Sequence, residues 1–160
     1  MKNSDLADLN TPDSGRLAIL EFYRAAQVNG ALTPAKVCDL GRKLTADRSI
    51  SRDEADALFM VDAAPVTKCA EWTEFLVEAM TDHVVWQSRP TGVLSSAQGE
   101  WLLAKADASM SISALAVLVH ILAEADRVPA WFIAAVRGRV ARGWPGVEEA
   151  IAAANMARAA

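Results

Sequence analysis

The sequence predicts an all-α helical bundle of about seven to eight helices, built by internal duplication. Apolar residues recur at the three- and four-residue spacing of amphipathic helices, and no segment alternates for long enough to be an ordinary strand. Serine, threonine and proline stand where these segments begin, as helix N-termini prefer. Two short motifs also recur at one fixed distance along the chain, which is typical of repeat proteins.

The repeat is visible as an ungapped offset of 62 residues. The motif Gly-x-Leu-Thr around Leu32 returns as Gly-x-Leu-Ser around Leu94, and 94 − 32 = 62. The polar turn around Ile50 returns around Ile112 at the same offset. Each copy is too small to bury its own apolar face, so we expect the two halves to cover one another. We also expect each isoleucine to form a one- or two-residue β-bridge with the leucine of its own copy.

Breaks in the pattern divide the chain into three parts. Residues 1–10 form a polar, flexible tail, residues 11–143 one helical domain, and residues 144–160 an Ala-rich C-terminal helix packed on that domain. Within the domain the repeats cover about residues 14–75 and 76–143. The sequence therefore predicts a single domain made of two halves.

The first repeat predicts three helices. Thr11-Pro12 supplies an N-cap followed by proline, and that helix continues to about Gln27. Thr33-Pro34 starts the second helix in the same way. Ser51 and Glu54 form the S-x-x-E capping box of the third helix.

The most regular amphipathic helix of the chain, whose apolar stripe includes Trp72, spans the boundary between the two repeats. Ser95 and Gln98 form a second capping box. Residues 114–125 are apolar on most sides, as a central buried helix is. Trp131 opens the last helix of the domain, and we expect it to match Trp72.

Composition narrows the classes of function. With 16 Lys and Arg against 20 Asp and Glu, the net charge is −4, which argues against a nucleic-acid partner. The first five residues lack the apolar core of a signal peptide, and no stretch reaches the roughly 18 apolar residues of a membrane helix. We therefore expect a cytoplasmic protein with no membrane partner. Cys38 and Cys69 are predicted to be buried thiols rather than a disulfide.

The polar turn before Ser51 is a candidate cation site. With Ile50 at the eighth position of a twelve-residue EF-hand loop, Asp47 and Glu54 fall at the fifth and twelfth positions, which are ligand positions. Lys43 then stands first, where a calcium loop needs a carboxylate. Asp47 and Glu54 are therefore the candidate ligands of calcium or another divalent cation. The alternative is a metal-free turn in which Glu54 serves only the capping box.

Three other side chains, His83, Trp86 and Trp144, are candidates for a ligand site or an interface. His83 lies on an apolar stripe, where a histidine is usually a hydrogen-bonded core or interface residue. His120 lies on the more polar edge of its helix, so we expect it to be partly exposed. Trp86 and Trp144 stand at helix ends next to breaks, where a partner surface can use them. No G-x-S-x-G elbow, Cys-x-x-Cys pair or Gly-rich phosphate loop is present, so no catalytic residue is predicted.

The order of short turn, capped helix, polar turn with one isoleucine and acidic-capped helix resembles the TerB-like, tellurite-resistance-associated helical proteins. It is also similar to uncharacterised helical proteins of high-GC bacteria that carry EF-hand-like turns. The likeness covers residues 14–143. It implies an all-α bacterial protein from a stress-response setting.

The sequence therefore predicts a non-enzymatic binding or scaffold protein without a cofactor, whose partner is an unknown protein or a second copy of the chain. Two alternatives stay open. One is a divalent-cation-binding protein with degenerate EF-hand-like turns, and the other is a protein that binds a small ligand or anion between its repeats.

Overall fold

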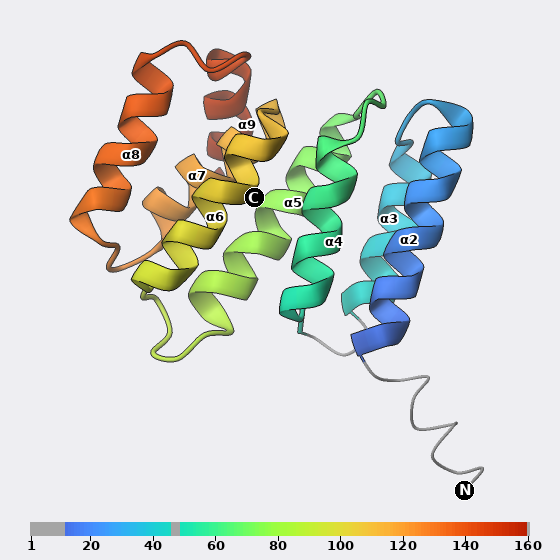
Figure 1. Ribbon diagram of the computed structural model, residues 1–160, viewed down its shortest axis with the longest axis horizontal. Helices are drawn as coiled ribbons and strands as arrows, with labels where there is room; N and C mark the ends of the chain where they lie inside the picture. The colour runs from blue at the N-terminus through green and yellow to red at the C-terminus, as the bar shows by residue number, and fades with distance from the viewer. Residues whose placement is uncertain (1–11, 46–48, 160) are drawn as a thin grey trace, which may run out of the picture.

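The described part of the chain is helical, as predicted. The computed structural model describes residues 12–45 and 49–159, with backbone alone at residues 12–14 and 157–159. In these residues the fold is an all-α bundle of eight α-helices and one π-helical turn (Figure 1). In order, they are α2 (Pro12–Asn29), α3 (Pro34–Leu44), α4 (Arg52–Ala63), α5 (Ala70–Thr81), η2 (Asp82–Trp86), α6 (Ser96–Ser109), α7 (Ile112–Glu124), α8 (Ala130–Ala141) and α9 (Val147–Ala159).

Local capping signals fix where these helices begin. Both predicted capping boxes are present, one at the start of α4 and one at the start of α6. In the first, the Ser51 N–H donates to the Glu54 carboxylate at 2.8 Å, and the Glu54 N–H donates to the Ser51 hydroxyl at 3.1 Å. Ser111 caps α7 by accepting the Ala114 N–H at 2.9 Å. Each cap satisfies N–H groups that the first helical turn leaves without a partner.

Two isolated parallel β-bridges occur at equivalent places in the two halves. Ala31 pairs with Thr67, and Val93 pairs with Arg127. In the first bridge the Leu32 N–H donates to the Thr67 carbonyl at 2.7 Å, and in the second the Leu94 N–H donates to Arg127 at 3.0 Å. The predicted pairing of these leucines with Ile50 and Ile112 is wrong. The segment before α3 pairs instead with the segment before α5, and the segment before α6 pairs with the segment before α8.

The sequence offset between the halves changes in the middle of the repeat. It is 62 at the first bridge residues, Ala31 and Val93, but 60 at their partners, Thr67 and Arg127. The change falls between these positions, where α6 is 14 residues long and α3 is 11. The second polar turn is correspondingly shorter.

This shift removes the predicted match between Ile50 and Ile112. Ile50 is buried in the extended segment before α4, whereas Ile112 is the first residue of α7 and is 40% exposed. The predicted match of Trp131 to Trp72 is also wrong, because at the offset of 60 the equivalent residue is Phe132. Both Trp72 and Phe132 are fully buried, while Trp131 is 40% exposed.

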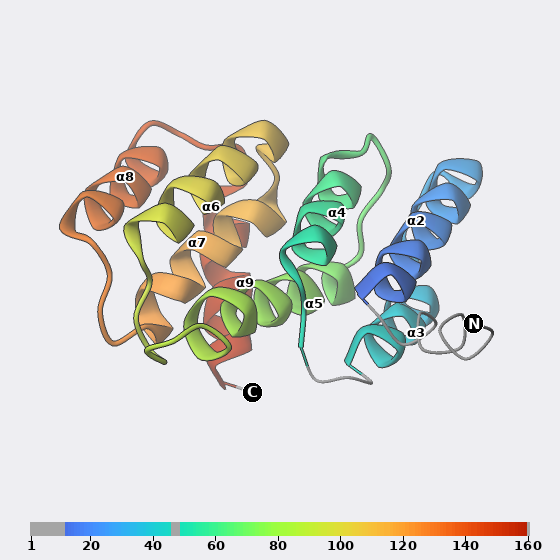
Figure 2. The same ribbon diagram turned by 60° about the horizontal axis from the view of Figure 1, so that its bottom comes forward.

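Helix α7 lies at the centre of the second half. It packs most extensively on α5 and α9 (Figure 2). Its side chains from Ser113 to Leu118 are all buried. This agrees with the apolar composition that predicts a central helix. In the first half, Trp72 of α5 stacks on Phe22 of α2 with ring centroids 5.8 Å apart. The helix α5 therefore belongs to the core of both halves.

A polar contact joins α4 of the first half to α6 of the second. The Trp101 indole N–H donates to Asp56 at 2.8 Å, and the Arg52 guanidinium lies 4.4 Å from the centroid of the Trp101 ring. Lys105 completes the group with its ammonium 3.2 Å from the Asp56 carboxylate. These contacts hold the two halves in one relative orientation.

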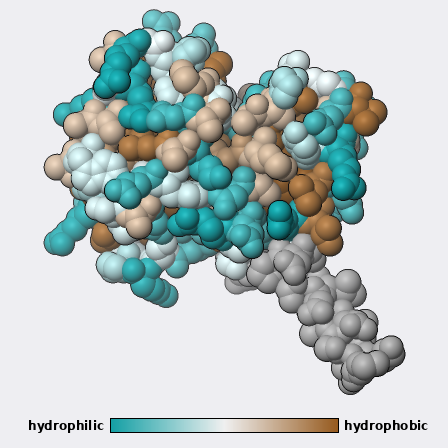
Figure 3. All heavy atoms as spheres, in the orientation of Figure 1, coloured by the Kyte–Doolittle hydropathy of each residue, from teal (hydrophilic) through white to brown (hydrophobic). Residues whose placement is uncertain are grey.

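Some hydrophobic side chains reach the surface. Figure 3 shows hydrophobic residues at the surface over α2 and α4, among hydrophilic ones. Leu17 of α2 and Met60 of α4 are among the exposed large residues. A second exposed set, which includes Met110, Ile112 and Met156, lies around the cleft described next.

Candidate functional site

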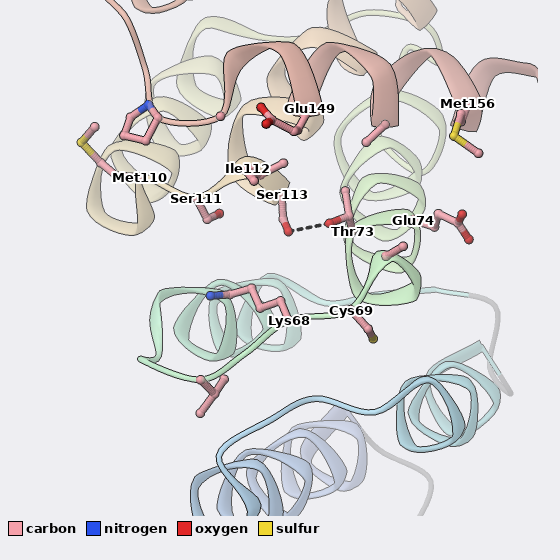
Figure 4. Close-up of a pocket in the computed structure, with 15 residues that line it drawn as sticks. Lys68, Cys69, Thr73, Glu74, Met110, Ser111, Ile112, Ser113, Glu149 and Met156 are labelled. Atoms are coloured by element: carbon pink, nitrogen blue, oxygen red, sulfur yellow. Dashed lines mark hydrogen bonds between the residues drawn. The ribbon is translucent and has the colours of Figure 1, made fainter.

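A cleft of about 640 Å³, which we call the α5–α9 cleft, lies between the two halves (Figure 4). Its volume falls in the range of small-molecule sites. One wall is the connection that leads into α5 together with the first turns of α5, and the other is the α6–α7 turn together with α9. Its lining residues are Val66, Lys68, Cys69, Ala70, Thr73, Glu74, Met110, Ser111, Ile112, Ser113, Pro145, Gly146, Glu149, Ala153 and Met156.

The wall formed by α9 depends on a close approach at Gly146. This residue has φ +76°, and a Cβ placed on it would lie 2.4 Å from Cγ1 of Ile112. A glycine here therefore allows both the left-handed turn before α9 and the contact with the first residue of α7. That contact brings α9 close enough to form one side of the cleft.

The floor of the cleft carries a pair of hydroxyl groups. Thr73 Oγ1 of α5 lies 2.8 Å from Ser113 Oγ of α7, and both residues are buried (Figure 4). Either hydroxyl can be the donor, so one of the two retains lone pairs that can accept from a ligand. Most of the remaining lining is apolar. A few polar groups in an apolar cavity are typical of a site that orients a small ligand.

Three charged side chains border the cleft. Lys68 lies on one wall and Glu149 on the opposite wall, while Glu74 lies toward the Met156 end (Figure 4). Among the described residues, none of the three has an oppositely charged partner within 4.0 Å. The Lys68 ammonium makes one long hydrogen bond, of 3.4 Å, to the Ala64 carbonyl. The charges of the cleft are therefore available to a ligand.

A buried carboxylate holds the two walls together. Asp62, at the end of α4, is 1% exposed and accepts the Trp72 indole N–H at 2.9 Å. The hydroxyls of Ser109 and Ser111 donate to its other oxygen. A buried carboxylate requires such donors, because its charge would otherwise lose the solvation of water. Asp62 thus anchors the α6–α7 turn of the second half to α4 and α5.

The predicted candidate His83 lies on the π-helical turn η2, outside the cleft lining. Its Nδ1 donates to the Ile50 carbonyl at 2.8 Å, and the Gln87 side chain accepts the Ile50 N–H at 3.1 Å. The side chains of His83 and Gln87 therefore supply hydrogen-bond partners for the carbonyl and the N–H of Ile50, which forms no β-bridge. Burial lowers the pKa of His83, while the hydrogen bond to Ile50 opposes that shift. The neutral imidazole with its proton on Nδ1 fits this structural contact.

Only one of the two predicted cation ligands lies in the part of the chain that the structure describes. Asp47 lies outside the part of the chain that the structure describes. Glu54 is buried and caps α4. Its Oε2 lies 1.5 Å from the position that a Cβ on Gly15 would occupy. Among the described residues, no three His, Cys, Asp or Glu side chains come close enough to hold a metal ion. The cation site stays a prediction.

Several expectations about exposure are wrong. Trp144 is buried and donates its indole N–H to the Ser111 carbonyl at 2.9 Å, so it supports the α6–α7 turn, while its use by a partner stays a prediction. His120 is also buried, and its Nδ1 has no hydrogen-bond partner in the described residues. Cys38 is exposed, and Cys69 is half-buried at the edge of the cleft. Of the aromatic candidates, Trp86 at the end of η2 is 40% exposed.

A smaller pocket of about 260 Å³ lies beside Ile50 and is bordered by two acidic side chains, Glu78 and Asp82. Burial raises the pKa of both carboxyl groups, and the neighbouring Asp82 and Glu74 charges raise that of Glu78 further. Burial therefore makes both carboxyl groups harder to ionise than exposed ones.

Comparisons with known proteins identify no relative. No family description, curated protein or solved structure matches the chain. The resemblance to TerB-like proteins therefore stays a prediction. No helix among the described residues combines the length and the apolar character needed to cross a bilayer.

Sequence reasoning did not identify the residues of the α5–α9 cleft. Lys68, Thr73, Ser113 and Glu149 lie in three separate segments and belong to no recognisable motif. The available signal was indirect: the second polar turn contains three serines, more than one helix cap needs. Two of them bind Asp62, and the third faces Thr73.

Proposed function

We propose that the protein is a non-enzymatic binding module that holds a small, mainly apolar ligand in the α5–α9 cleft. The observation that carries this proposal is the combination of a volume of about 640 Å³ with an apolar lining and a buried hydroxyl pair at the floor. Such cavities bury most of the surface of a small ligand and orient it with a few polar groups. Of the sequence-based alternatives, this one corresponds to a ligand bound between the repeats.

The methyl groups of the cleft offer a direct test. Spectra of protein with ¹³C-labelled Met and Ile methyl groups are recorded while indole is added as an apolar probe. We expect the signals of Met110, Ile112 and Met156 to move, because these side chains line the cleft. Met60, which is exposed on α4 outside the cleft, should not move.

A matched pair of variants separates the cleft from general surface binding. Ala70→Trp places a large side chain in the cleft, and Ala134→Trp places the same side chain on the exposed face of α8. Indole shifts should disappear in the first variant and persist in the second, with both proteins folded by circular dichroism. Equal shifts at Met60 and at the cleft methyls, or shifts that survive Ala70→Trp, would contradict the proposal.

A further inference from the structure

The charges of the α5–α9 cleft indicate which class of small ligand it binds. We propose, on the basis of the function proposed above, that the ligand is a zwitterion with an apolar body, such as an apolar amino acid or short peptide with free ends. Lys68 would take its carboxylate and Glu149 its ammonium group. The side chains of the ligand would then lie on the apolar surface between these two charges.

The opposed positions of the two charges support this assignment. Lys68 precedes α5 on one wall, and Glu149 lies in the first turns of α9 on the other (Figure 4). Within the described chain neither has an oppositely charged partner, so neither charge is neutralised inside the protein. A ligand with charge at only one end would pair with either Lys68 or Glu149 and would leave the other of these two side chains unpaired beside the apolar part of the ligand. A zwitterion pairs both, and the third charged side chain of the cleft, Glu74, is exposed toward the Met156 end and stays in solvent.

The position of Glu149 is itself constrained. Its Oε2 lies 3.6 Å from where a Cβ on Gly146 would be, so the carboxylate lies over the turn that starts α9. Negative charge is favourable at the N-terminus of a helix, which helps to hold this carboxylate in place. Lys68 is half-buried, and its aliphatic stem forms part of the wall while its ammonium group stays accessible. Both groups are therefore positioned before a ligand arrives.

The ends of the ligand can be tested one at a time. Calorimetric titrations use the dipeptide Leu-Leu, its N-acetyl form, its C-terminal amide and the doubly capped form. A partly exposed ion pair contributes up to about 1 kcal/mol, so each cap should weaken binding by up to about fivefold. The doubly capped form should bind most weakly, because it retains only the apolar contacts.

Variants assign each end to its residue. In Lys68→Met, amidation of the C-terminus should no longer weaken binding, while acetylation should still do so. In Glu149→Gln the pattern should be reversed. Glu148→Gln and Lys36→Met alter exposed charges outside the cleft and should retain both cap effects. Melting temperatures of all four variants show whether the fold is intact.

The outcomes distinguish this inference from the proposed function. If capped and free dipeptides bind equally, or if no dipeptide binds while indole still shifts the cleft methyls, the zwitterion assignment is wrong and the binding module stands. If neither indole nor any dipeptide perturbs the cleft, both proposals fail. Loss of the cap effects in Glu148→Gln would also overturn the assignment, because that carboxylate does not line the cleft.

Discussion

Replacing Asp62 with alanine should destabilise the whole molecule rather than one helix. Its buried carboxylate receives the Trp72 indole N–H and the hydroxyls of Ser109 and Ser111, so it links α4, α5 and the α6–α7 turn. Asp62→Ala leaves the buried Trp72 N–H without an acceptor, removes the acceptor of the two half-buried serine hydroxyls and opens a small void. It removes a contact on which the relative position of the two halves depends.

The magnitude follows from the number and kind of these contacts. A hydrogen bond to a charged group contributes about 1.5–3 kcal/mol, but three donors that share one carboxylate do not add independently. Removing the acceptor of a buried donor typically costs about 1–3 kcal/mol, and we expect Asp62→Ala, which also takes the acceptor from two serine hydroxyls, to lower the free energy of unfolding by about 2–3 kcal/mol. Asp62→Asn keeps an acceptor for Trp72, and the serine hydroxyls can turn to accept from its amide. We expect a smaller loss of about 1–2 kcal/mol.

Urea unfolding followed by tryptophan fluorescence and by far-ultraviolet circular dichroism measures both changes. Asp39→Ala is the control, because Asp39 is an exposed carboxylate whose ion pairs with Lys43 and Arg42 lie within α3. It should leave the unfolding midpoint nearly unchanged. A loss below about 1 kcal/mol for Asp62→Ala, or equal effects of Asp62→Ala and Asp39→Ala, would refute the reasoning.

Two further predictions concern stability. Gly15→Ala should lower the free energy of unfolding by about 1–3 kcal/mol, because its Cβ would lie 1.5 Å from Glu54 Oε2 and displace the α4 cap. Gly41→Ala meets only the Phe75 ring, at 3.6 Å, and should raise stability by up to about 1 kcal/mol through helix propensity, as urea unfolding of both variants can show. Burial lowers the pKa of His83 below 6.5, so the unfolded chain binds more protons than the folded chain as the pH falls below that value. Stability should therefore decline as the pH falls below 6.5. This part of the decline should be absent in His83→Asn, whose amide keeps a donor near the Nδ1 position. The measurement is the melting temperature as a function of pH. If its pH profile is the same in His83→Asn as in the unchanged protein, another group is responsible for the decline.

The positions of the helices follow from short-range signals. Proline at the start of α2 and the capping boxes at Ser51 and Ser95 are local features that need no partner from elsewhere in the chain. The composition of α7 likewise shows that it is buried, since a helix that is apolar on most sides has no face for solvent. These are the predictions that the structure confirms.

Tertiary contacts decide how the second half aligns with the first. Aligning the two repeats by sequence identity matches Ser113 to Ser51, the N-cap of α4, but Ser111 is the residue that caps α7. Either serine has the chemistry of an N-cap. The choice is made by Asp62, which binds Ser111, and by Thr73, which lies against Ser113.

The sequence alone thus determined that the chain forms amphipathic, capped helices with a repeated order, because caps and apolar spacing act within a few residues. The π-helical turn at His83, the burial of Trp144 and the α5–α9 cleft were decided only in the folded molecule. Each depends on residues far apart in the chain. Lys68 and Glu149, on the opposite walls of the cleft, are far apart in the sequence and form no local pattern. Their opposed positions follow only from the packing of α5, α7 and α9.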